Sequence, residues 1–305
     1  MKRIYALEMS DGVFIHVVSY APSGECKGHI HFLHGLGDHH SRYEPFFDYL
    51  NTEGYFVSTH DQRGHGETGK KSNHFGYFAE HNGFERITED VREIIQHVRQ
   101  STTLPPVILI GHSMGSFVAR RYAQLYGGSI QSLIAIGTIA PTTIKEKLAK
   151  PLIQAFVRFQ GKEKPNELLQ SLSFGAYNKT VKNPSTEFDW LSHNKANVQT
   201  YIDDPYTGFV SSNQLFLDLS EAFEKLENLE ENQKIPKNLP ILLLSGKDDA
   251  LIHMGKGIWK VAALYEKAGL TNVTVSLIEK NRHEVLMEEN KEETYKFLVK
   301  WIEGV

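Results

Sequence analysis

The chain has almost no cysteine, and this scarcity removes two kinds of site. Cys26 is the single cysteine in 305 residues, so neither an internal disulfide nor a cluster of thiolate metal ligands can form. A single cysteine is consistent with a protein that resides in a reducing compartment. The first residues, MKRIYALEMSDGVF, also lack the apolar core of about 7–15 residues that a signal peptide carries. We therefore expect a cytoplasmic protein.

Long hydrophobic runs and an excess of basic charge are missing as well. No window reaches the roughly 18 apolar residues of a membrane-spanning helix. The formal net charge is -4, and lysine and arginine are scattered along the chain, which gives no electrostatic reason to expect a nucleic-acid partner. Hydrophobic residues still make up 40% of the chain. This is enough for a large core in one domain, or in one domain with an insertion.

Short apolar runs alternate with helical patterns over the first part of the chain. YALEM and VFIHVVSY flank a Ser-Asp-Gly turn at residues 10–12, which predicts an opening β-hairpin because Asp-Gly favours the positive φ angles of tight turns. Later runs at 30–33, 55–59 and 107–110 each end in a Gly-containing loop and lead, after a variable gap, into helix-like sequence. This alternation predicts a mostly parallel sheet covered by helices.

The alternation stops in the middle of the chain and resumes near its end. Residues 141–236 hold mostly helical patterns and no convincing parallel strand. Strand patterns return at 241–244 and 273–278. We therefore predict an α/β fold in which residues 1–140 and 237–305 form the core domain and residues 141–236 form an inserted helical cap.

The run ILIGHSMGSF ends a predicted strand in a serine between two glycines. Gly111-x-Ser113-x-Gly115, directly after a strand and before a helix, is typical of a nucleophile elbow, in which a sharp turn presents the serine hydroxyl at the carboxyl end of the strand. A side chain at either glycine would crowd the neighbouring strand or helix. The flanking strand and helix favour this elbow over a glycine-rich turn that carries an incidental serine.

A serine nucleophile needs a base and an orienting acid, which in this type of elbow follow in the order Ser, Asp, His. After PILLLSG come Asp248 and Asp249, and after VTVSLIEK comes His283. The only other histidine in this region, His253, lies too close to the acid loop to reach Ser113 from the last strand. We predict His283 as the base and Asp249 as the acid, with Asp248 as a solvated or loop-capping carboxylate.

Acyl transfer also needs hydrogen-bond donors for the developing oxyanion. One expected donor is the backbone N–H of Met114, the residue after the nucleophile. The other should lie on the loop after the predicted strand HIHFL, which reads HGLGD from His34 to Asp38. Because the glycines let the backbone approach the substrate closely, the N–H of Leu36 is the second expected donor.

Two histidine-containing motifs have simpler explanations than a functional site. HIHFLHGLGDHH contains an HxH pair, which can begin a metal site. His29 and His31 nevertheless lie on the same face of a predicted buried strand, and no second ligand cluster with metal spacing follows, so we expect no metal and no cofactor. The charged loop DQRGHG, after YFVSTH, is better explained as a brace that hydrogen-bonds the neighbouring loop.

Five motifs, in this order and spacing, resemble the α/β-hydrolase superfamily, specifically its bacterial lysophospholipase and monoacylglycerol lipase-like branch: HGLGDH, DQRGHG, GHSMGS, SGKDDALI and NRHEVLMEE. The similarity spans nearly the whole chain and includes the cap sequence WLSHNKANVQTYIDDPYTGF. It implies an α/β-hydrolase fold with helices on both faces of the central sheet. It also implies a Ser113, Asp249 and His283 triad with Leu36 and Met114 as oxyanion donors. Lipase members often carry a smaller residue at the Leu36 position, so the width of the acyl pocket should differ.

These observations predict a serine carboxylester hydrolase that cleaves a monoacyl lipid, such as a monoacylglycerol or a lysophospholipid, through an acyl-enzyme. Two alternatives stay open. One is an aminopeptidase-like or other amide or thioester hydrolase of the same fold, for which Asp203 and Asp204 offer weak candidates for a carboxylate that binds the substrate amine. The other is a small-ligand receptor that keeps the triad without turnover.

Apolar side chains of the predicted cap have three possible roles: they cover an acyl tunnel, touch a membrane surface transiently, or only pack on the body. The side chains are Leu148, Leu152, Phe156, Phe159, Tyr206 and Phe209. An acyl tunnel predicts a sharp chain-length preference, because each buried methylene contributes about 0.8 kcal/mol.

Overall fold

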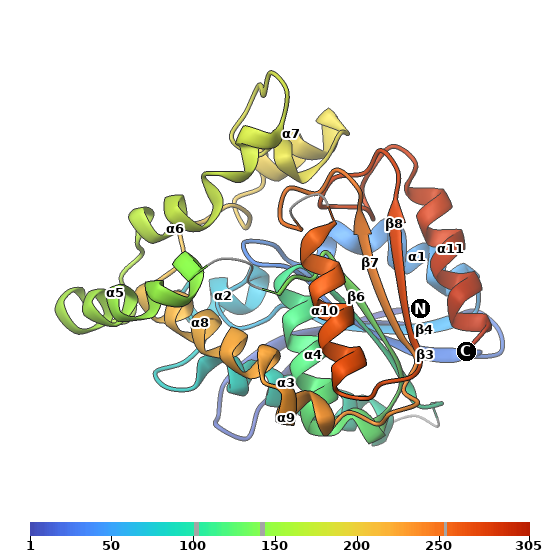
Figure 1. The fold of residues 1–305 in the computed structure, drawn as a ribbon. Coiled ribbons are helices and arrows are strands. Elements are labelled where there is room, and N and C mark those ends of the chain that lie inside the picture. Colours follow the sequence, from blue (N-terminus) through green and yellow to red (C-terminus); the bar gives the residue numbers. More distant parts are fainter. Residues whose placement is uncertain (101–103, 141–143, 253–254) are drawn as a thin grey trace.

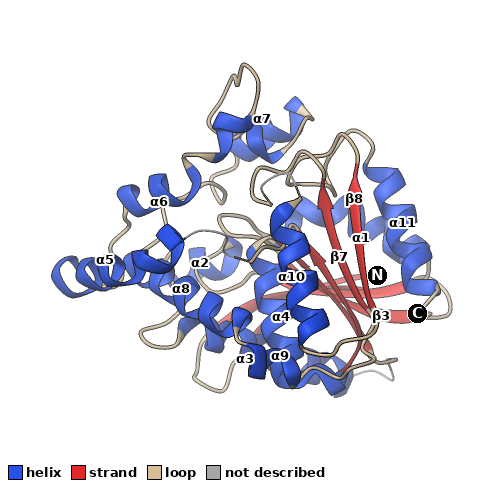
Figure 2. Ribbon diagram, in the orientation of Figure 1, coloured by secondary structure: helices blue, strands red, loops and turns tan. Residues whose placement is uncertain are grey.

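The computed structural model describes residues 1–100, 104–140, 144–252 and 255–305, and the side chains of residues 144–149 are outside this description. His253 and the Leu148 side chain therefore lie outside the described part. Within it, eight strands form one sheet in the order β1-β2-β4-β3-β5-β6-β7-β8 (Figures 1 and 2). The strands are β1 Lys2–Glu8, β2 Phe14–Tyr20, β3 Gly28–Leu33, β4 Tyr55–His60, β5 Val107–His112, β6 Ile130–Ile136, β7 Ile241–Gly246 and β8 Val273–Ile278.

The predicted hairpin and the parallel sheet are both confirmed. β1 and β2 pair antiparallel, with Glu8 opposite Phe14, and Gly12 in the turn has a φ of 83°. β2 pairs antiparallel with β4, and all pairs from β4 through β3, β5, β6 and β7 to β8 are parallel. The carboxyl ends of β3 and β5 to β8 therefore meet at one edge of the sheet, where loops after different strands can form a joint site.

Helices cover both faces of this sheet, as predicted. Alternate residues of β5 point to opposite faces: Val107 and Leu109 pack in the cluster that includes α3 and α4, while Ile108 and Ile110 pack in the cluster that includes α1 and α11. The helices of the body are α1 Glu44–Thr52, α2 Gly66–Ser72, α3 Gly83–Gln100, α4 Met114–Tyr126, α10 Lys256–Lys267 and α11 Lys291–Glu303.

The described part of the segment between β6 and β7 is mostly helical. The longer elements of this segment are α5 Ile144–Gln160, α6 Glu167–Phe174, α7 Lys195–Asp203, α8 Asn213–Glu227 and α9 Leu229–Gln233, with short 3₁₀ turns at Tyr177–Thr180 and Asp189–Leu191. Helices α5, α6 and α7 project away from the sheet (Figure 1). The β-contact found in the described residues of this segment is an isolated bridge between Pro165 and Ser212.

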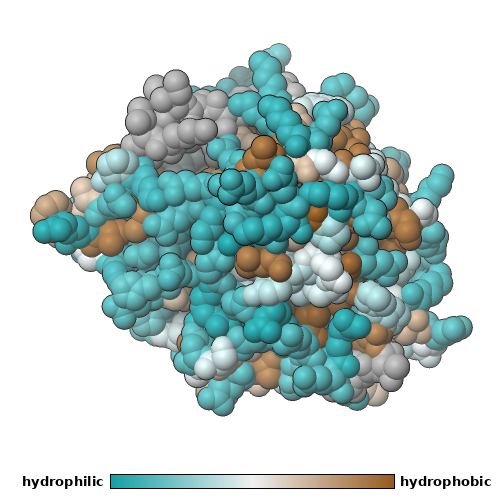
Figure 3. Space-filling model, turned by 60° about the horizontal axis from the view of Figure 1, so that its bottom comes forward, coloured by the Kyte–Doolittle hydropathy of each residue, from teal (hydrophilic) through white to brown (hydrophobic). Residues whose placement is uncertain are grey.

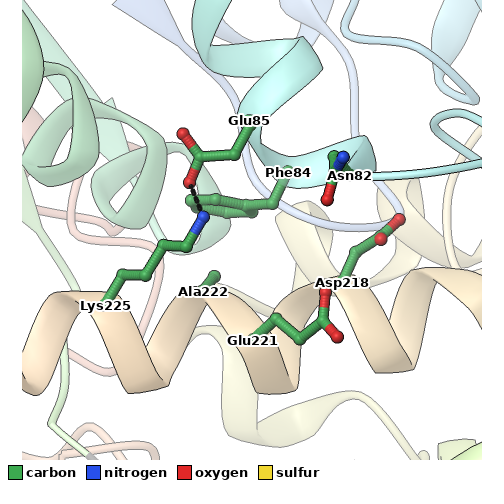
Figure 4. Close-up of a pocket in the computed structure, with 7 residues that line it drawn as sticks. All are labelled: Asn82, Phe84, Glu85, Asp218, Glu221, Ala222 and Lys225. Atoms are coloured by element: carbon green, nitrogen blue, oxygen red, sulfur yellow. Dashed lines mark hydrogen bonds and ion pairs between the residues drawn. The ribbon is translucent and has the colours of Figure 1, made fainter.

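One helix of this segment packs on the body. Leu215, Ala222 and Leu226 of α8 belong to the same buried cluster as residues of α3 and α4. A small pocket lies between α3 and α8, where Lys225 donates to Glu85 at 2.6 Å (Figure 4). Residues 144–236 thus combine a projecting part with a helix of the body layer, and the predicted cap over residues 141–236 stays a prediction.

The surface contains scattered rather than continuous hydrophobic areas on the face drawn in Figure 3, which is mostly hydrophilic. Within the described ranges, no helix is both long and apolar enough to cross a membrane. The larger exposed apolar side chains of the projecting helices are Leu152, Phe159, Leu168, Leu172 and Ile202.

Candidate active site

Ser113 occupies a strained turn between β5 and α4. Its φ is 54° and its ψ is -122°, a backbone conformation that residues other than glycine rarely adopt. The Ser113 N–H donates to the carbonyl of Ile136 at the end of β6, at 2.8 Å. The Ser116 N–H donates to the Ser113 carbonyl, also at 2.8 Å. The serine is therefore fixed where β5 and β6 end.

The two glycines around Ser113 are required by packing, as the sequence predicted. A Cβ on Gly111 would overlap the backbone of Gly115, and a Cβ on Gly115 would overlap the carbonyl oxygen of Leu33 on β3. The turn can therefore close only if neither position carries a side chain. This confirms the elbow geometry that the GHSMG motif predicted.

Asp249 and His283 come together at the carboxyl ends of the adjacent strands β7 and β8. The Nδ1 of His283 donates to Oδ2 of Asp249 at 2.9 Å, and the two side chains are 2% and 0% exposed. The carboxylate also accepts from the Ser245 hydroxyl at 3.0 Å and from the Leu251 N–H at 2.8 Å. The carboxylate is thus held from three sides, so it can fix the orientation of the His283 ring.

The neighbouring Asp248 points elsewhere. Its Oδ2 lies 3.0 Å from Nε2 of His193, and its side chain is 42% exposed. The structure thus brings Asp249, and not Asp248, to His283. A solvent-exposed pair of this kind contributes little to stability.

Burial and pairing act in opposite directions on the buried pair. Burial alone would lower the pKa of His283, but the charge of Asp249 and the hydrogen bond to it outweigh burial, so the pKa lies above its usual value. Burial alone would raise the pKa of Asp249, but the interaction with His283 and the other donors outweighs burial and lowers this pKa. The pair therefore favours a charged aspartate that stabilises a protonated histidine.

Ser113 and His283 adjoin the same short segment at the end of β6. Ser113 is hydrogen-bonded to Ile136, and a Cβ on the next residue, Gly137, would lie 2.9 Å from Cε1 of His283. Among the described residues, the Ser113 hydroxyl and the His283 ring form no direct hydrogen bond. Such bonds are commonly long in ligand-free enzymes and shorten when substrate binds.

Gly35, which precedes the predicted oxyanion donor Leu36, lies beside Ser113, and the other predicted donor, Met114, follows Ser113 in the chain. We call residues 34–39 the glycine loop. A Cβ on Gly35 of this loop would lie 3.2 Å from Cβ of Ser113, so its backbone passes directly beside the serine. Leu36 follows Gly35, and Met114 is the first residue of α4, where a backbone N–H has no acceptor within the helix. Leu36 and Met114 are thus each next in the chain to one residue of this contact, Gly35 or Ser113, and their role as oxyanion donors stays a prediction.

The loop DQRGHG braces the glycine loop, as predicted. The Gln62 N–H donates to Nε2 of His34 at 3.0 Å, and the Gln62 side chain donates to the His34 carbonyl at 2.8 Å. Asp61 accepts from both the backbone N–H and Nδ1 of His40, at 2.9 and 2.7 Å. The DQRGHG loop is therefore hydrogen-bonded to the chain both before Gly35, at His34, and after Gly37, at His40.

A group of three possible metal ligands, His16, His40 and Asp61, has its ligand atoms within 4.8 Å of one another. Hydrogen bonds account for the arrangement, because Asp61 already accepts from His40 and from the Glu67 N–H at 2.8 Å, at the start of α2. His29 and His31 are also explained without a metal, since both contact the Ser58 hydroxyl, at 2.7 and 2.8 Å.

Two aromatic residues beside His283 escaped the sequence analysis. The ring of Trp190 lies 5.2 Å from the His283 ring, and the ring of His112 lies 4.9 Å from it, measured between centroids. Burial, with His283 nearby, lowers the pKa of His112 to about 4, so this ring is neutral. His112 directly precedes Ser113, which was an available signal, whereas no sequence pattern connected Trp190 with His283.

The chain is similar to known hydrolases. The family model described as Hydrolase_4, serine aminopeptidase, S33, matches residues 24–290. Monoglyceride lipase of Homo sapiens is 28% identical over 283 residues, which cover 85% of this chain and 80% of the human protein. Monoacylglycerol lipase of Mycolicibacterium smegmatis is 23% identical over 291 residues, which cover 95% of this chain and 93% of that protein.

Solved structures share the fold. A thermostable carboxyl esterase from Bacillus coagulans, in complex with glycerol, superposes with a TM-score of 0.92 at 23% identity, over 100% of this chain and 98% of the esterase. The α/β-hydrolase fold and the resemblance to monoacylglycerol lipases are therefore confirmed. The chain is a hydrolase that belongs to the α/β-hydrolase family described as Hydrolase_4, serine aminopeptidase, S33.

Proposed function

We propose that this hydrolase cleaves carboxylic esters of monoacyl lipids, such as monoacylglycerols or lysophospholipids. The observation that carries the proposal is the buried 2.9 Å hydrogen bond between His283 and Asp249, next to Ser113 on a positive-φ elbow. The relatives named monoglyceride lipase support the substrate class. The proposal includes a cytoplasmic location and no cofactor.

In the proposed mechanism, His283 acts first as a base and then as an acid. Because its Nδ1 is bonded to Asp249, Nε2 accepts the proton of Ser113 while the serine Oγ attacks the ester carbon. The N–H groups of Leu36 and Met114 stabilise the oxyanion. Collapse of the tetrahedral intermediate breaks the bond to the alcohol, which takes the proton from His283. Water then attacks the acyl-enzyme in the same way and releases the fatty acid.

The projecting helices support a lipid substrate. Phe159 and Leu152 of α5 are 81% and 46% exposed, and Leu172 of α6 is 63% exposed. Apolar side chains of this size at the surface favour contact with acyl chains or with a lipid surface. Tyr206 and Phe209 instead lie against Phe75, with centroid distances of 6.0 and 5.4 Å. A transient contact of the cap with a membrane surface is part of the proposal.

The family description favours an aminopeptidase as the second candidate. Such an enzyme needs a carboxylate that is available to a substrate amine. Asp204 already accepts from Nε2 of His39 at 2.9 Å, and Asp203 accepts from the Gln199 side chain at 2.8 Å. The two cap carboxylates considered from the sequence are therefore engaged, which favours the ester substrate.

A mixed substrate panel tests the proposal. Wild-type protein should release fatty acid from monoacylglycerols or lysophospholipids, and Ser113→Ala should reduce this rate by at least about 10⁴-fold. Ser10→Ala, in the exposed hairpin turn, serves as the matched control and should retain full activity. Cleavage of aminoacyl amides alone would replace the lipid substrate with the second candidate. Labelling of Ser113 by a fluorophosphonate without any turnover would instead indicate a small-ligand receptor.

A further inference from the structure

The cap holds the backbone of the glycine loop directly. The hydroxyl of Tyr201, on α7, donates to the carbonyl of Gly37 at 3.0 Å, and the N–H of Gly208 lies 3.1 Å from the same carbonyl. The Gly208 N–H also lies 3.1 Å from the Tyr201 hydroxyl, so the three groups share one set of hydrogen bonds. Gly37 immediately follows Leu36, the proposed oxyanion donor.

Close packing leaves the Tyr201 hydroxyl few other orientations. The Tyr201 side chain is buried, and its ring lies 5.1 Å from the ring of Phe188 and 4.8 Å from the Arg42 guanidinium. Gly37 has a φ of 60°, and a Cβ there would lie 3.3 Å from the Tyr201 hydroxyl and 3.4 Å from the nitrogen of Gly208. The absence of a side chain at Gly37 is therefore what allows the cap to approach the loop this closely.

Further contacts tie the same part of the cap to the body near the glycine loop. His39, at the end of the loop, donates from Nε2 to Asp204 at 2.9 Å. Arg42 donates to Asn197 of α7 at 3.2 Å and, through two nitrogens, to Glu284 at 2.7 and 3.0 Å. Glu284 directly follows His283. The start of α7 is thus linked through Arg42 to Glu284, and the chain that follows α7 is linked to the glycine loop at His39.

We propose that Tyr201 is a positioning residue, which orients the oxyanion donor of Leu36 by holding the Gly37 carbonyl. Glycines on both sides of Leu36 make this backbone intrinsically free to rotate. A donor that is fixed before the reaction costs no reorganisation when the oxyanion forms. The cap therefore completes the oxyanion site. This inference rests on the proposed function, because it needs Ser113 as the nucleophile.

Tyr201→Phe tests the inference, because it removes one hydroxyl and retains the ring. Tyr122→Phe is the matched control, since Tyr122 is also buried and its hydroxyl bonds Ser129 at the other end of α4. We expect Tyr201→Phe to lower kcat for the best ester about ten- to a hundredfold, with KM changed less than about twofold. The rate at which a fluorophosphonate labels Ser113 should fall in parallel, while Tyr122→Phe should retain both rates.

A boronic acid that forms a tetrahedral adduct with Ser113 gives a further readout. Tyr201→Phe should weaken the binding of this adduct about as much as it lowers kcat, and should leave the affinity for the fatty acid product unchanged. Unchanged kcat and labelling rates in Tyr201→Phe would overturn the inference, as would an equal loss of affinity for the boronic acid and for the product. If wild-type protein cleaves no ester, the proposed substrate fails, and the labelling rates still decide the role of Tyr201.

Discussion

The His283 ring and the Asp249 carboxylate form a buried pair, with Nδ1 of the histidine 2.9 Å from Oδ2 of the aspartate. The adjacent Asp248 carries the same functional group, but it faces His193 in a partly exposed position. Two chemically identical side chains next to each other in the chain thus have different environments. The contrast provides an internal control for the role of the acid.

Asp249→Asn should therefore reduce turnover far more than Asp248→Asn. An asparagine at 249 cannot stabilise a protonated His283 and presents an amide that disturbs the histidine tautomer, so we expect kcat to fall by about 10³–10⁴-fold. Asp248→Asn loses only an exposed pair with His193 and should keep kcat within about twofold. Steady-state kinetics of both variants on one ester check this expectation. Similar losses in the two variants would contradict the assignment of Asp249 as the acid.

The pH dependence of the reaction should report the same pair. Since His283 must be neutral to accept the serine proton and its pKa lies above the usual 6.5, kcat/KM should rise with pH through a midpoint above 6.5. The pair should stabilise the fold fully below the unfolded-state pKa of the histidine, and this contribution should be lost as pH rises through the folded-state pKa. As pH rises through the folded-state pKa of His283, kcat/KM should therefore increase while the contribution of the pair to the free energy of unfolding decreases.

Asp249→Asn again supplies the comparison. Without the aspartate charge, burial lowers the pKa of His283, so the midpoint of the remaining activity should move to lower pH. A pH–rate series on wild-type protein and on Asp249→Asn measures both midpoints. If kcat/KM rises with the same midpoint in both proteins, this rise reports the titration of a group other than His283.

Sequence reasoning located the parts of the site that follow directly from strand ends. Ser113, Asp249 and His283 each follow an apolar run, and in a parallel sheet the carboxyl ends of neighbouring strands meet at one edge. Glycine was equally informative, because Gly111 and Gly115 mark close backbone contacts that only glycine permits. Local sequence carries both signals, so neither depends on how the cap is placed.

The contacts made by the cap could not be predicted in this way. Helical periodicity indicates that one face of α8 is buried, but it does not say against which element, and α8 proves to pack on α3 and α4. Trp190 and Tyr201 lie in the segment WLSHNKANVQTYIDDPYTGF, whose sequence indicates no partner for either side chain. Their contacts with His283 and Gly37 join positions 93 and 164 residues apart in the chain, so they depend on the tertiary fold.

Gly111→Ala should destabilise the protein and abolish most activity. The added Cβ would overlap the backbone of Gly115, which cannot move without displacing the elbow, so we expect a loss of about 3 kcal/mol or more in the free energy of unfolding. Gly128→Ala is the matched control: no atom lies within 4 Å of its added Cβ, and reduced freedom of the unfolded chain should stabilise it by up to about 1 kcal/mol. Urea unfolding of both variants measures the difference, and equal stability would contradict the close contact at Gly111.

Arg42→Met should cost more stability than the loss of an exposed ion pair. Arg42 pairs with two buried carboxylates, those of Glu284 and Asp38, which are 2% and 4% exposed. Removing the guanidinium leaves both without this cation, at about 3–5 kcal/mol. Arg92→Met, which breaks the more exposed pair with Glu89, should cost less than about 1 kcal/mol. Adding Glu284→Gln to Arg42→Met should recover at least about 1 kcal/mol of the loss, because no unpaired charge then remains at Glu284. Additive losses in the double variant, measured by urea unfolding, would show that the two side chains stabilise the fold independently.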